Sequence, residues 1–372
     1  MLISNHSRVV HLTSVHIRYD TRIFIKMCSS LVKGGFDVSL IVADGKGNEI
    51  KNDVKIYDVG AITSSKILRM INTVDRVFKK AKEIDGDIYH LHDPELLRVG
   101  LKLKKLGKKV IFDSHEDIPR QILSKSYLNI YLKKIVSVIF SLYQTYVCKK
   151  FDYVIAATPH IRDLFIKKNI PSLDINNFPI IGELAKGASW SDKRDEICYI
   201  GGVSRIRGIK ELVESMIYTS KVKLNLGGSC SEKNFEKELK SSTGWLRVKY
   251  LGFLKRDEVA NILMKSKAGM VTLLPAPSYI DSLPVKMFEY MSAGLPIIAS
   301  SFPLWKEIVE GHNCGICVNP NDPKEIASAI TFIINHPNEA EKMGKNGRKV
   351  VVEKYNWANE EDKLFKIYKI LI

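Results

Sequence analysis

The chain has 372 residues, which is more than one ordinary hydrophobic core accommodates and enough for two domains. An apolar content of 45% with 26% charged residues excludes an intrinsically disordered chain. The formal net charge is +16, and most of the excess lies before residue 180, which favours an anionic partner such as phospholipid, a lipid pyrophosphate or nucleic acid. A basic surface that contacts only solvent, with no anionic partner, would give the same excess of positive charge.

Strands and helices alternate along the first half of the chain. Their apolar and polar patterns predict buried strands at 9–14, 36–44, 54–59, 87–91, 108–114 and 151–157, and helices at 23–33, 70–83, about 95–106 and 160–168. Continuous apolar strands separated by helices indicate a parallel sheet covered on both faces. Asp85-Gly86-Asp87 resembles a metal-binding D-x-D, but it precedes a strand and is interpreted as a turn. His90 lies inside that strand and is expected to be packed.

Polar side chains follow three of these strands, at the carboxyl ends where open parallel sheets bind ligands. They are candidates for an acceptor site or cleft: His16, Arg18, Arg22, His92, Asp93, His115 and Glu116. Three such clusters at equivalent points of separate strand–helix units predict one functional edge of the sheet.

Residues 122–150 form a different kind of segment. No charge occurs from 135 to 147, lysines flank that run at 133, 134, 149 and 150, and tyrosines are interleaved with it. Lysine and tyrosine around an apolar helix are typical of a membrane interface. A long helix docked on the sheet would give the same apolar face, so both interpretations stay open.

The second half repeats the alternation of strands and helices after a polar linker. Strands are predicted at 196–200, 222–226, 245–251, 268–274, 295–300 and 314–320. We therefore predict an α/β chain of two doubly wound parallel-sheet domains with a site in the cleft between them. The domains are 1–178 and 193–352, the linker is 179–192, and a C-terminal helix at 353–372 packs back toward the first domain.

The stretch from Pro275 to Pro296 joins a Pro- and Ser-rich loop to a helix that Gly294 ends. The free N–H groups and positive dipole end of such a helix suit a phosphate, and the carboxylates of Asp281 and Glu289 suit sugar hydroxyls. This combination predicts a site for a sugar phosphate or a nucleotide sugar.

A second candidate site is the loop GGVSRIRG. Gly201 and Gly202 allow a close approach of the backbone, and Arg205 and Arg207 can pair with a pyrophosphate. The loop lacks the G-x-G-x-x-G spacing, which disfavours a dinucleotide-dependent dehydrogenase. An ordinary glycine turn is the alternative.

These motifs together resemble glycosyltransferase family 4 over the whole chain. DSLPVKMFEYMSAGLPIIAS resembles the family's E-x7-E region, with Asp281 in place of the first Glu. YIGGVSRIRGIKEL resembles its glycine loop, with Gly202 at the usual Arg, Arg207 at the usual Lys and Arg205 near enough to restore the missing charge. HLHDPELL resembles the end of a strand that carries a functional His. The resemblance implies the GT-B fold, two Rossmann-like domains that face a central cleft.

The resemblance also implies roles for single residues. Asp281 would hold hydroxyls of the donor sugar, Glu289 the nucleotide ribose, and backbone N–H groups near Ser282 and Leu283 the phosphate or sugar. His92 would face the reacting sugar. With Asp281 and Arg207 it forms the candidate catalytic set, and arginines with a helix dipole would replace a metal. The donor-binding candidates are Gly201, Gly202, Arg205, Arg207, Asp281, Ser282, Leu283 and Glu289. No metal or other cofactor is expected.

We accordingly predict a retaining hexosyltransferase that uses a nucleotide sugar. Its acceptor would be a polyprenyl-diphosphate-linked saccharide or a polysaccharide of the O-antigen, capsule or exopolysaccharide type. With few cysteines, no signal peptide and no membrane-spanning run, the enzyme would be cytoplasmic and peripheral on the inner face of the plasma membrane, held by 122–150. The alternatives are a GT-B epimerase or phosphorylase and, more remotely, a nucleic-acid-binding protein, which the absence of a binding motif disfavours.

Overall fold

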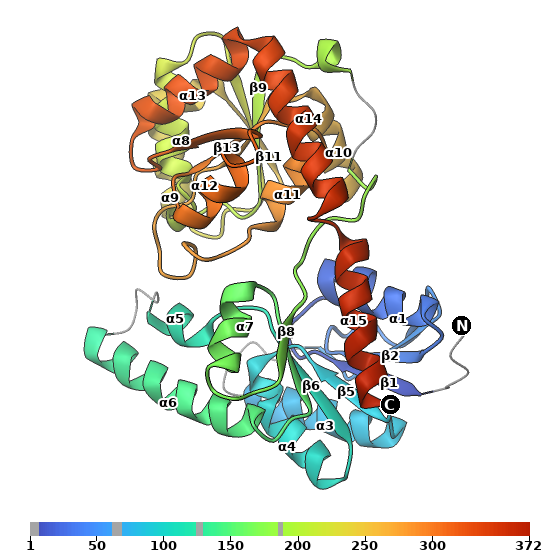
Figure 1. Ribbon diagram of the computed structural model, residues 1–372. Helices are drawn as coiled ribbons and strands as arrows, with labels where there is room; N and C mark the ends of the chain where they lie inside the picture. The colour runs from blue at the N-terminus through green and yellow to red at the C-terminus, as the bar shows by residue number, and fades with distance from the viewer. Residues whose placement is uncertain (1–6, 62–68, 124–128, 185–188) are drawn as a thin grey trace. The chain divides into compact units, whose positions relative to one another are not determined.

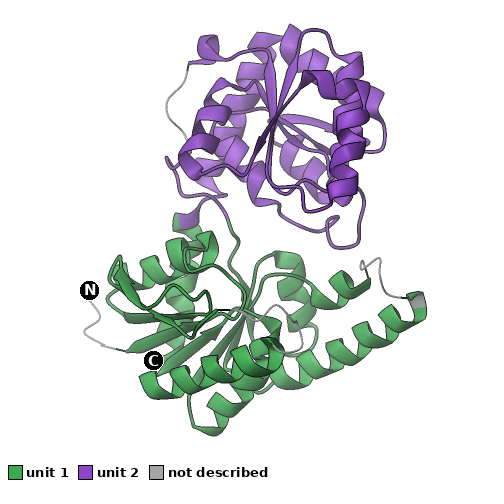
Figure 2. Ribbon diagram, turned by 180° about the vertical axis from the view of Figure 1, so that it is seen from behind, with its two compact units in different colours: residues 1–177, 358–372 green, residues 178–357 purple. Residues whose placement is uncertain are grey.

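The computed structural model describes residues 7–61, 69–123, 129–184 and 189–372, and the chain divides into two compact units (Figure 2). Unit 1 consists of 1–177 together with 358–372, and unit 2 of 178–357. Each unit has its own sheet and its own core. The predicted architecture of two parallel-sheet α/β domains is confirmed.

The sheet of unit 1 has eight strands in the order β3-β4-β2-β1-β5-β6-β7-β8 (Figure 1). All pairs are parallel except the hairpin of β3 with β4. The strands are β1 (Arg8–Leu12), β2 (Asp37–Val42), β3 (Glu49–Lys51), β4 (Val54–Asp58), β5 (Ile88–Leu91), β6 (Lys109–Ser114), β7 (Tyr153–Ala156) and β8 (Ser172–Asp174). The pattern did not predict β3 and β8, because three residues are too few to show an alternation.

One face of this sheet carries a large hydrophobic core. Successive side chains of a strand point to opposite faces, so Val10, Leu12, Tyr89 and Leu91 lie on the same side. Four helices cover them: α3 (Val74–Ile84), α4 (Leu97–Lys105), α6 (Ile130–Cys148) and α7 (Pro159–Ile166). The short segments η2 (Arg69–Thr73), η3 (Pro94–Leu96) and α5 (Ile118–Leu123) lead into or follow these elements.

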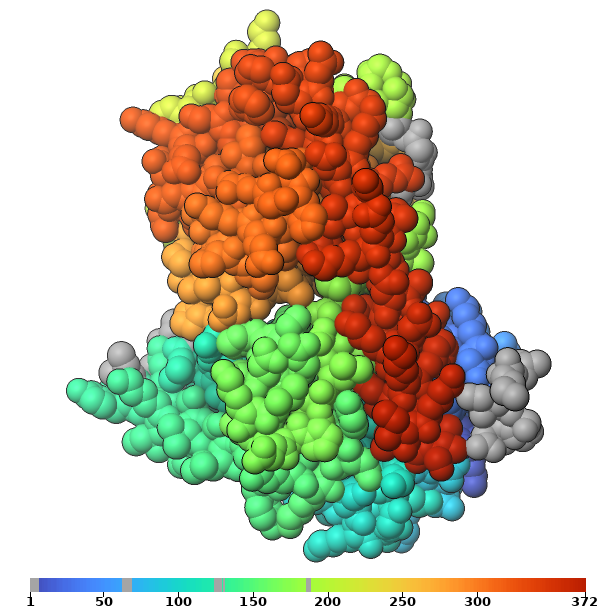
Figure 3. Space-filling model, viewed as in Figure 1, coloured from blue at the N-terminus to red at the C-terminus, as the bar shows by residue number. Residues whose placement is uncertain are grey.

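The opposite face is covered by segments from both ends of the chain. Near the N-terminus the predicted helix at 23–33 is a π-helical segment, η1 (Thr21–Cys28), followed by α1 (Ser29–Lys33). The Asp20 carboxylate starts η1 by accepting the N–H groups of Arg22 and Ile23. The C-terminal helix α15 (Trp357–Leu371) supplies the other cover from Ala358 onward and is visible as a dark red ridge on the flank of unit 1 (Figure 3).

Unit 2 has a six-stranded parallel sheet in the order β11-β10-β9-β12-β13-β14. The strands are β9 (Glu196–Ile200), β10 (Lys223–Gly227), β11 (Val248–Gly252), β12 (Ala268–Val271), β13 (Ile297–Ser300) and β14 (Gly315–Val318). All six were predicted. The predicted strand at 245–251 starts later than expected, because Thr243–Arg247 form the 3-10 segment η7.

Helices cover both faces of this second sheet. One face packs on α8 (Ile209–Ser215), α9 (Lys233–Ser241) and α13 (Pro323–Asn335), and the other on α10 (Arg256–Lys265), α11 (Val285–Ser292), α12 (Pro303–Val309) and α14 (Pro337–Glu353). The remaining segments are η4 (Trp190–Asp192), η5 (Arg205–Arg207) and η6 (Met216–Tyr218). The crossover order places the glycine loop after β9 beside the start of α11.

The predicted helical region 122–150 contains the end of α5 and the whole of α6, and residues 124–128 lie outside the described part of the chain. Its C-terminal end enters the core through Val147 and Cys148. None of the helices among the described residues is both long and apolar enough to cross a membrane.

Candidate functional site

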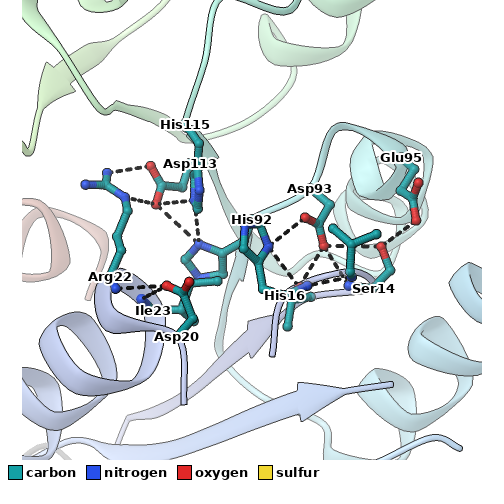
Figure 4. Close-up of polar contacts among 12 residues, drawn as sticks. Ser14, His16, Asp20, Arg22, Ile23, His92, Asp93, Glu95, Asp113 and His115 are labelled. Atoms are coloured by element: carbon teal, nitrogen blue, oxygen red, sulfur yellow. Dashed lines mark hydrogen bonds and ion pairs between the residues drawn. The ribbon is translucent and has the colours of Figure 1, made fainter. Parts of the chain in front are cut away.

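In unit 1 five of the predicted polar residues meet at the carboxyl ends of β1, β5 and β6, namely His16, Arg22, His92, Asp93 and His115 (Figure 4). His11 of β1 is in register with His90 of β5, and His90 with Ile111 of β6. His92 and Asp113 each follow two residues later and therefore share that face of the sheet. The register brings the side chains of His92 and Asp113 together, with ring nitrogen Nδ1 3.2 Å from Oδ2.

A chain of buried hydrogen bonds runs through this cluster. Asp113 accepts from His92 Nδ1, and His92 Nε2 lies 2.8 Å from His11 Nδ1. The Tyr368 hydroxyl of α15 lies 3.4 Å from His11 Nε2 and 2.9 Å from His90 Nδ1. One assignment of protons satisfies all four contacts: His90 donates to Tyr368, Tyr368 to His11, His11 to His92, and His92 to Asp113. This assignment fixes the tautomer of His92.

The charges of the cluster follow from its burial. Burial holds the pKa values of His11 and His90 well below the ordinary value and lowers the pKa of His92 to about 4. Burial alone would raise the pKa of Asp113, but the charges of Arg22 and His115 and its hydrogen bonds hold it well below the ordinary value. The three adjacent imidazoles of His11, His90 and His92 are therefore neutral, and Asp113 is a carboxylate.

His92 was predicted to face the reacting sugar, and its side chain lies in the interior instead. The ring is buried, both of its nitrogens are bonded within unit 1, and its backbone N–H donates to Leu12. The histidines of this edge that reach solvent are His16 and His115, with side chains 28% and 21% exposed. A contact of His92 with a sugar stays a prediction, and His16 and His115 are better placed to make one.

Arg18 and Arg22 were predicted to line the cleft, and the structure commits both guanidinium groups to internal partners. Arg22 donates to both carboxylate oxygens of Asp113, at 2.9 and 2.7 Å, and to the carbonyl of Ile175. Arg18 binds both oxygens of Asp44 in the same way, at 2.7 and 2.6 Å. Such bidentate pairs hold the loops after β1 and β2 in place, which is a structural role.

Asp93 organises the loop that follows β1. One carboxylate oxygen accepts from the Thr13 hydroxyl and the Ser14 N–H, and the other lies 2.9 Å from His16 Nδ1. Glu116 accepts a hydrogen bond from Gln121 at the entrance to α5. His16, Asp93 and His115 therefore lie together as predicted, while Glu116 serves its own helix.

The His16–Asp93 pair predicts a pH dependence of stability. Burial works to lower the pKa of His16, but the hydrogen bond and charge of Asp93 outweigh it and raise the pKa above 6.5. Charged His16 contributes its full stabilisation below pH 6.5, the ordinary pKa of histidine. That stabilisation is lost as the pH rises through the raised pKa of His16 in the folded protein. The pKa of Asp93 is lowered to about 2, so its contribution is present above 3.8 and is lost toward pH 2.

We therefore expect an NMR titration to give His16 a pKa above 6.5 in the wild type. In Asp93→Asn the pKa of His16 should be lower, because the hydrogen bond and the charge that raise it are lost. The melting temperature of Asp93→Asn should lie below that of the wild type by a margin that shrinks as the pH rises above the pKa of His16. An unchanged His16 titration in the variant would contradict the pairing.

Two overlapping groups in unit 1 could hold a metal ion. Among the described residues, ligand atoms within 4.8 Å of one another occur in His11, His90 and His92 and in His92, Asp113 and His115. His11, His92 and Asp113 are already joined by hydrogen bonds, Arg22 occupies both oxygens of Asp113, and the buried Nε2 of His90 has no partner among the described residues. A metal would have to displace these contacts, so the geometry does not favour one, and the absence of a metal cofactor stays a prediction.

In unit 2 the glycine loop lies between β9 and α8. At Gly201 the backbone has φ +145°, and a Cβ there would lie 2.7 Å from the Lys286 amine nitrogen and 3.2 Å from an Arg207 nitrogen. The next two residues, Gly202 and Val203, lead into the 3-10 turn η5 that carries both arginines. A side chain at 201 would therefore fill the place where two cations approach the backbone.

The two arginines of this loop have different surroundings. Arg207 is partly buried and hydrogen-bonds the Tyr199 and Tyr279 side chains. Arg205 points to α9, where it pairs with both oxygens of Glu238 and lies over the Phe235 ring at 4.7 Å. Of the two predicted donor-binding arginines, only Arg207 reaches the glycine backbone, and Arg205 is held on the surface by its partner.

The loop before α11 is held by its own backbone. Backbone N–H groups near Ser282 and Leu283 were predicted to serve the phosphate or sugar. The N–H of Ser282 donates to the carbonyl of Tyr279, and the Trp305 indole donates to the Ser282 carbonyl. Leu283 packs against the core, and Asp281 lies partly buried in the turn. Glu289 accepts from Arg256 at 2.7 Å, and Arg256 also binds Glu183.

Several of these residues went unrecognised in the sequence: Asp113, His11, Tyr368, Arg256 and Lys286. Two carried a signal, since Asp113 stands in an apolar strand and Lys286 in an apolar helix, where an isolated charge requires a partner. The others carried none, because their partners come from distant elements.

Two sequence models match adjoining parts of this chain. One, described as glycosyltransferase family 4, matches residues 21–176, and one, described as glycosyl transferases group 1, matches 182–350. The chain belongs to glycosyltransferase family 4. The predicted recognition and the predicted enzyme class, a glycosyltransferase of the hexosyltransferase type, are thereby confirmed.

Relatives of this family 4 glycosyltransferase match it over most of its length. An uncharacterised glycosyltransferase of Methanocaldococcus jannaschii is 24% identical over 92% of either chain. Sucrose-phosphate synthase from Thermosynechococcus elongatus superposes with a TM-score of 0.77 at 17% identity, covering 98% of this chain and 99% of its own. Anabaena HepE, solved with UDP and glucose, has a TM-score of 0.75 at 14% identity over 98% and 100%. These structures confirm the GT-B fold.

Proposed function

We propose that this glycosyltransferase takes a sugar from a nucleotide-diphosphate sugar and transfers it with retained anomeric configuration. The acceptor is a polyprenyl-diphosphate-linked saccharide or a polysaccharide of the cell surface, of the O-antigen, capsule or exopolysaccharide type. The observation that carries the donor class is the convergence of Arg207 and Lys286 on the backbone at Gly201, next to the start of α11. Two cations at a glycine loop beside a helix N-terminus match the charge of a diphosphate.

The chemistry of the transfer explains why such a site is needed. When the bond between the anomeric carbon and the diphosphate breaks, negative charge develops on the leaving oxygen. Fixed cations and a helix dipole stabilise that charge without a metal. Retention follows if the acceptor attacks on the face that the diphosphate leaves, with the leaving phosphate oxygen taking the acceptor's proton. The HepE structure, which was solved with UDP and glucose, supports a nucleotide donor in this fold.

The acceptor side of the proposal rests on α6. A row of large apolar side chains on this helix is more than a third exposed: Tyr131, Leu132, Ile135, Val136, Val138, Ile139, Leu142, Tyr143 and Tyr146. A groove of about 540 Å³ beside its end, toward α4, is lined by Arg98, Lys102, Lys105 and Lys150. An apolar helix face next to a basic groove suits the surface of an anionic membrane. We infer that the enzyme works on the cytoplasmic face of the plasma membrane and meets its lipid-linked acceptor there.

Substitution of the α6 face tests this attachment. Ile139→Glu and Leu142→Glu should each weaken binding to vesicles that contain anionic phospholipid by about tenfold or more, because an exposed apolar side chain gains about 1.5 kcal/mol or more when buried in lipid. Neutralising Lys133, Lys134, Lys149 and Lys150 should remove the preference for anionic over neutral vesicles. Leu246→Glu, at an apolar position of unit 2 that is even more exposed, is the control. If none of these substitutions changes vesicle binding, α6 is excluded as the membrane contact.

The reaction itself is tested with a panel of nucleotide sugars and a polyprenyl-diphosphate saccharide. We expect acceptor-dependent release of a nucleoside diphosphate from one donor, and an NMR spectrum in which donor and product share the anomeric configuration. An inverted product would refute retention. Conversion of the nucleotide sugar without any acceptor would favour the epimerase alternative, and dependence on inorganic phosphate the phosphorylase. Nothing in the site favours nucleic acid.

A further inference from the structure

We propose that Lys286 is a diphosphate-binding residue of the donor site and is the second cation beside Arg207, in the place predicted for Arg205. The inference rests on the proposed nucleotide-sugar donor and names a residue that neither the motifs nor the family resemblance assigned. Its observations all come from unit 2.

Lys286 occupies an unusual place for a lysine. It stands at the second position of α11, in the apolar context PVKMFEYM, and its amine nitrogen is buried although the residue as a whole is half-buried. That nitrogen has no hydrogen-bond partner among the residues that the structure describes. It lies 3.7 Å from the centre of the Tyr199 ring, which offers a cation–π contact but no acceptor. A buried amine with three donors and no acceptor is costly unless a ligand supplies one.

The direction of the side chain identifies the kind of ligand. Lys286 crosses from α11 to the backbone at Gly201, where its nitrogen and an Arg207 nitrogen approach the same point. The nearest carboxylate on its own helix, that of Glu289, is held by Arg256. Two like charges that converge on a glycine without a carboxylate repel each other, and an anion between them removes that repulsion. A diphosphate, with two charged groups and several acceptor oxygens, can serve both cations.

Arg205 does not compete for this role. It points to the other side of the loop, pairs with Glu238 and is 53% exposed. The glycine at 202, where the family pattern has an arginine, leaves that charge missing, and Lys286 supplies it from a different element. The chain thus restores the cation pair across the sheet, between the β9–α8 loop and the start of α11.

This placement predicts a proton signature of binding. The groups that face Lys286 are Arg207 of η5, Glu289 of its own helix, and Cys198 and Tyr199 of β9. Burial first and Arg207 second hold the pKa of Lys286 well below its ordinary value in the free protein, while Glu289 and Cys198 act weakly against them. A bound diphosphate favours the charged amine, so binding at alkaline pH takes up protons from the buffer.

Calorimetry with inorganic pyrophosphate, UDP and uridine tests the proposal. Lys286→Met should weaken binding of pyrophosphate and UDP by about 10–100-fold, the loss expected for one charge-assisted hydrogen bond. Binding of uridine, which has no phosphate, should not change. Titrations in buffers of different ionisation enthalpy should show proton uptake for the wild type at alkaline pH and none for Lys286→Met or Lys286→Arg. Lys210→Met, which removes a lysine of α8 that pairs with Glu238, is the matched control.

The outcomes separate the two levels of the proposal. If the wild type binds pyrophosphate or UDP and Lys286→Met binds them equally with the same proton uptake, the role of Lys286 is refuted and the donor class stands. If the wild type binds neither pyrophosphate nor any nucleoside diphosphate of a full panel, the role of Lys286 and the proposed donor class are both refuted. Lys286→Arg keeps the charge and should recover part of the affinity, which separates a lost contact from a misfolded variant, as does an unchanged circular dichroism spectrum.

Discussion

Replacing Asp113 with Ala is expected to destabilise unit 1 by about 3–5 kcal/mol, because the change leaves the buried Arg22 guanidinium without its counter-charge. Asp113 is fully buried and accepts two hydrogen bonds from Arg22, and His92 and His115 also contact it. The loss should appear in denaturant unfolding, followed by amide exchange of β1, β5 and β6.

The chain offers two controls for this result. Asp37 is also a strand aspartate of unit 1 paired with a cation, Lys55 at 2.8 Å, but the Asp37 and Lys55 side chains are only half-buried. Asp37→Ala should therefore cost only about 0–1 kcal/mol. All four tryptophans lie in unit 2, so their fluorescence reports that unit and should keep its transition in Asp113→Ala. Equal losses for the two aspartates would contradict the buried-pair account.

The second large effect is expected in the reaction. Arg207→Ala should lower kcat/KM by about 10²–10³, as the loss of one fixed donor at a developing charge does in other enzymes. Arg207 is the arginine that reaches Gly201, and its contacts with Tyr199 and Tyr279 hold it there. The measurement is nucleoside diphosphate release with the donor and acceptor found in the panel.

Arg205→Ala is the matched control, since it removes an arginine from the same turn. Because Arg205 pairs with Glu238 on the surface, its loss should change kcat/KM by less than about threefold. If Arg205→Ala is as damaging as Arg207→Ala, the original prediction from the motif is correct and the assignment made from the structure is wrong. Arg207→Lys should fall between the wild type and Arg207→Ala, because lysine keeps the charge and loses the bidentate geometry.

The architecture could be predicted because it depends on local patterns. Apolar strands that alternate with helices identified both sheets, and a polar end after each strand identified the functional edge in unit 1. The π-helical η1 was missed, since its apolar spacing does not distinguish it from an α-helix. The strands β3 and β8 were missed because three residues are too few to show an alternating pattern.

The site was harder to predict because partners come from distant elements. Arg18 and Arg22 have the composition of a ligand site, yet Asp44 and Asp113 neutralise them inside unit 1. The tautomer of His92 depends on Tyr368, whose helix follows the whole of unit 2 in the sequence. The isolated lysine at 286 was visible in the sequence, but only the approach of its amine to Gly201 gives it a role.

The central claim is that unit 2 holds the diphosphate of a nucleotide sugar between the glycine loop and α11. Hydrogen–deuterium exchange with and without a saturating nucleoside diphosphate tests it most directly. We expect new protection at 199–208 and 279–289, and its loss in Arg207→Ala. Protection confined to unit 1, or unchanged exchange at both unit 2 segments while the nucleotide is demonstrably bound, would contradict the account.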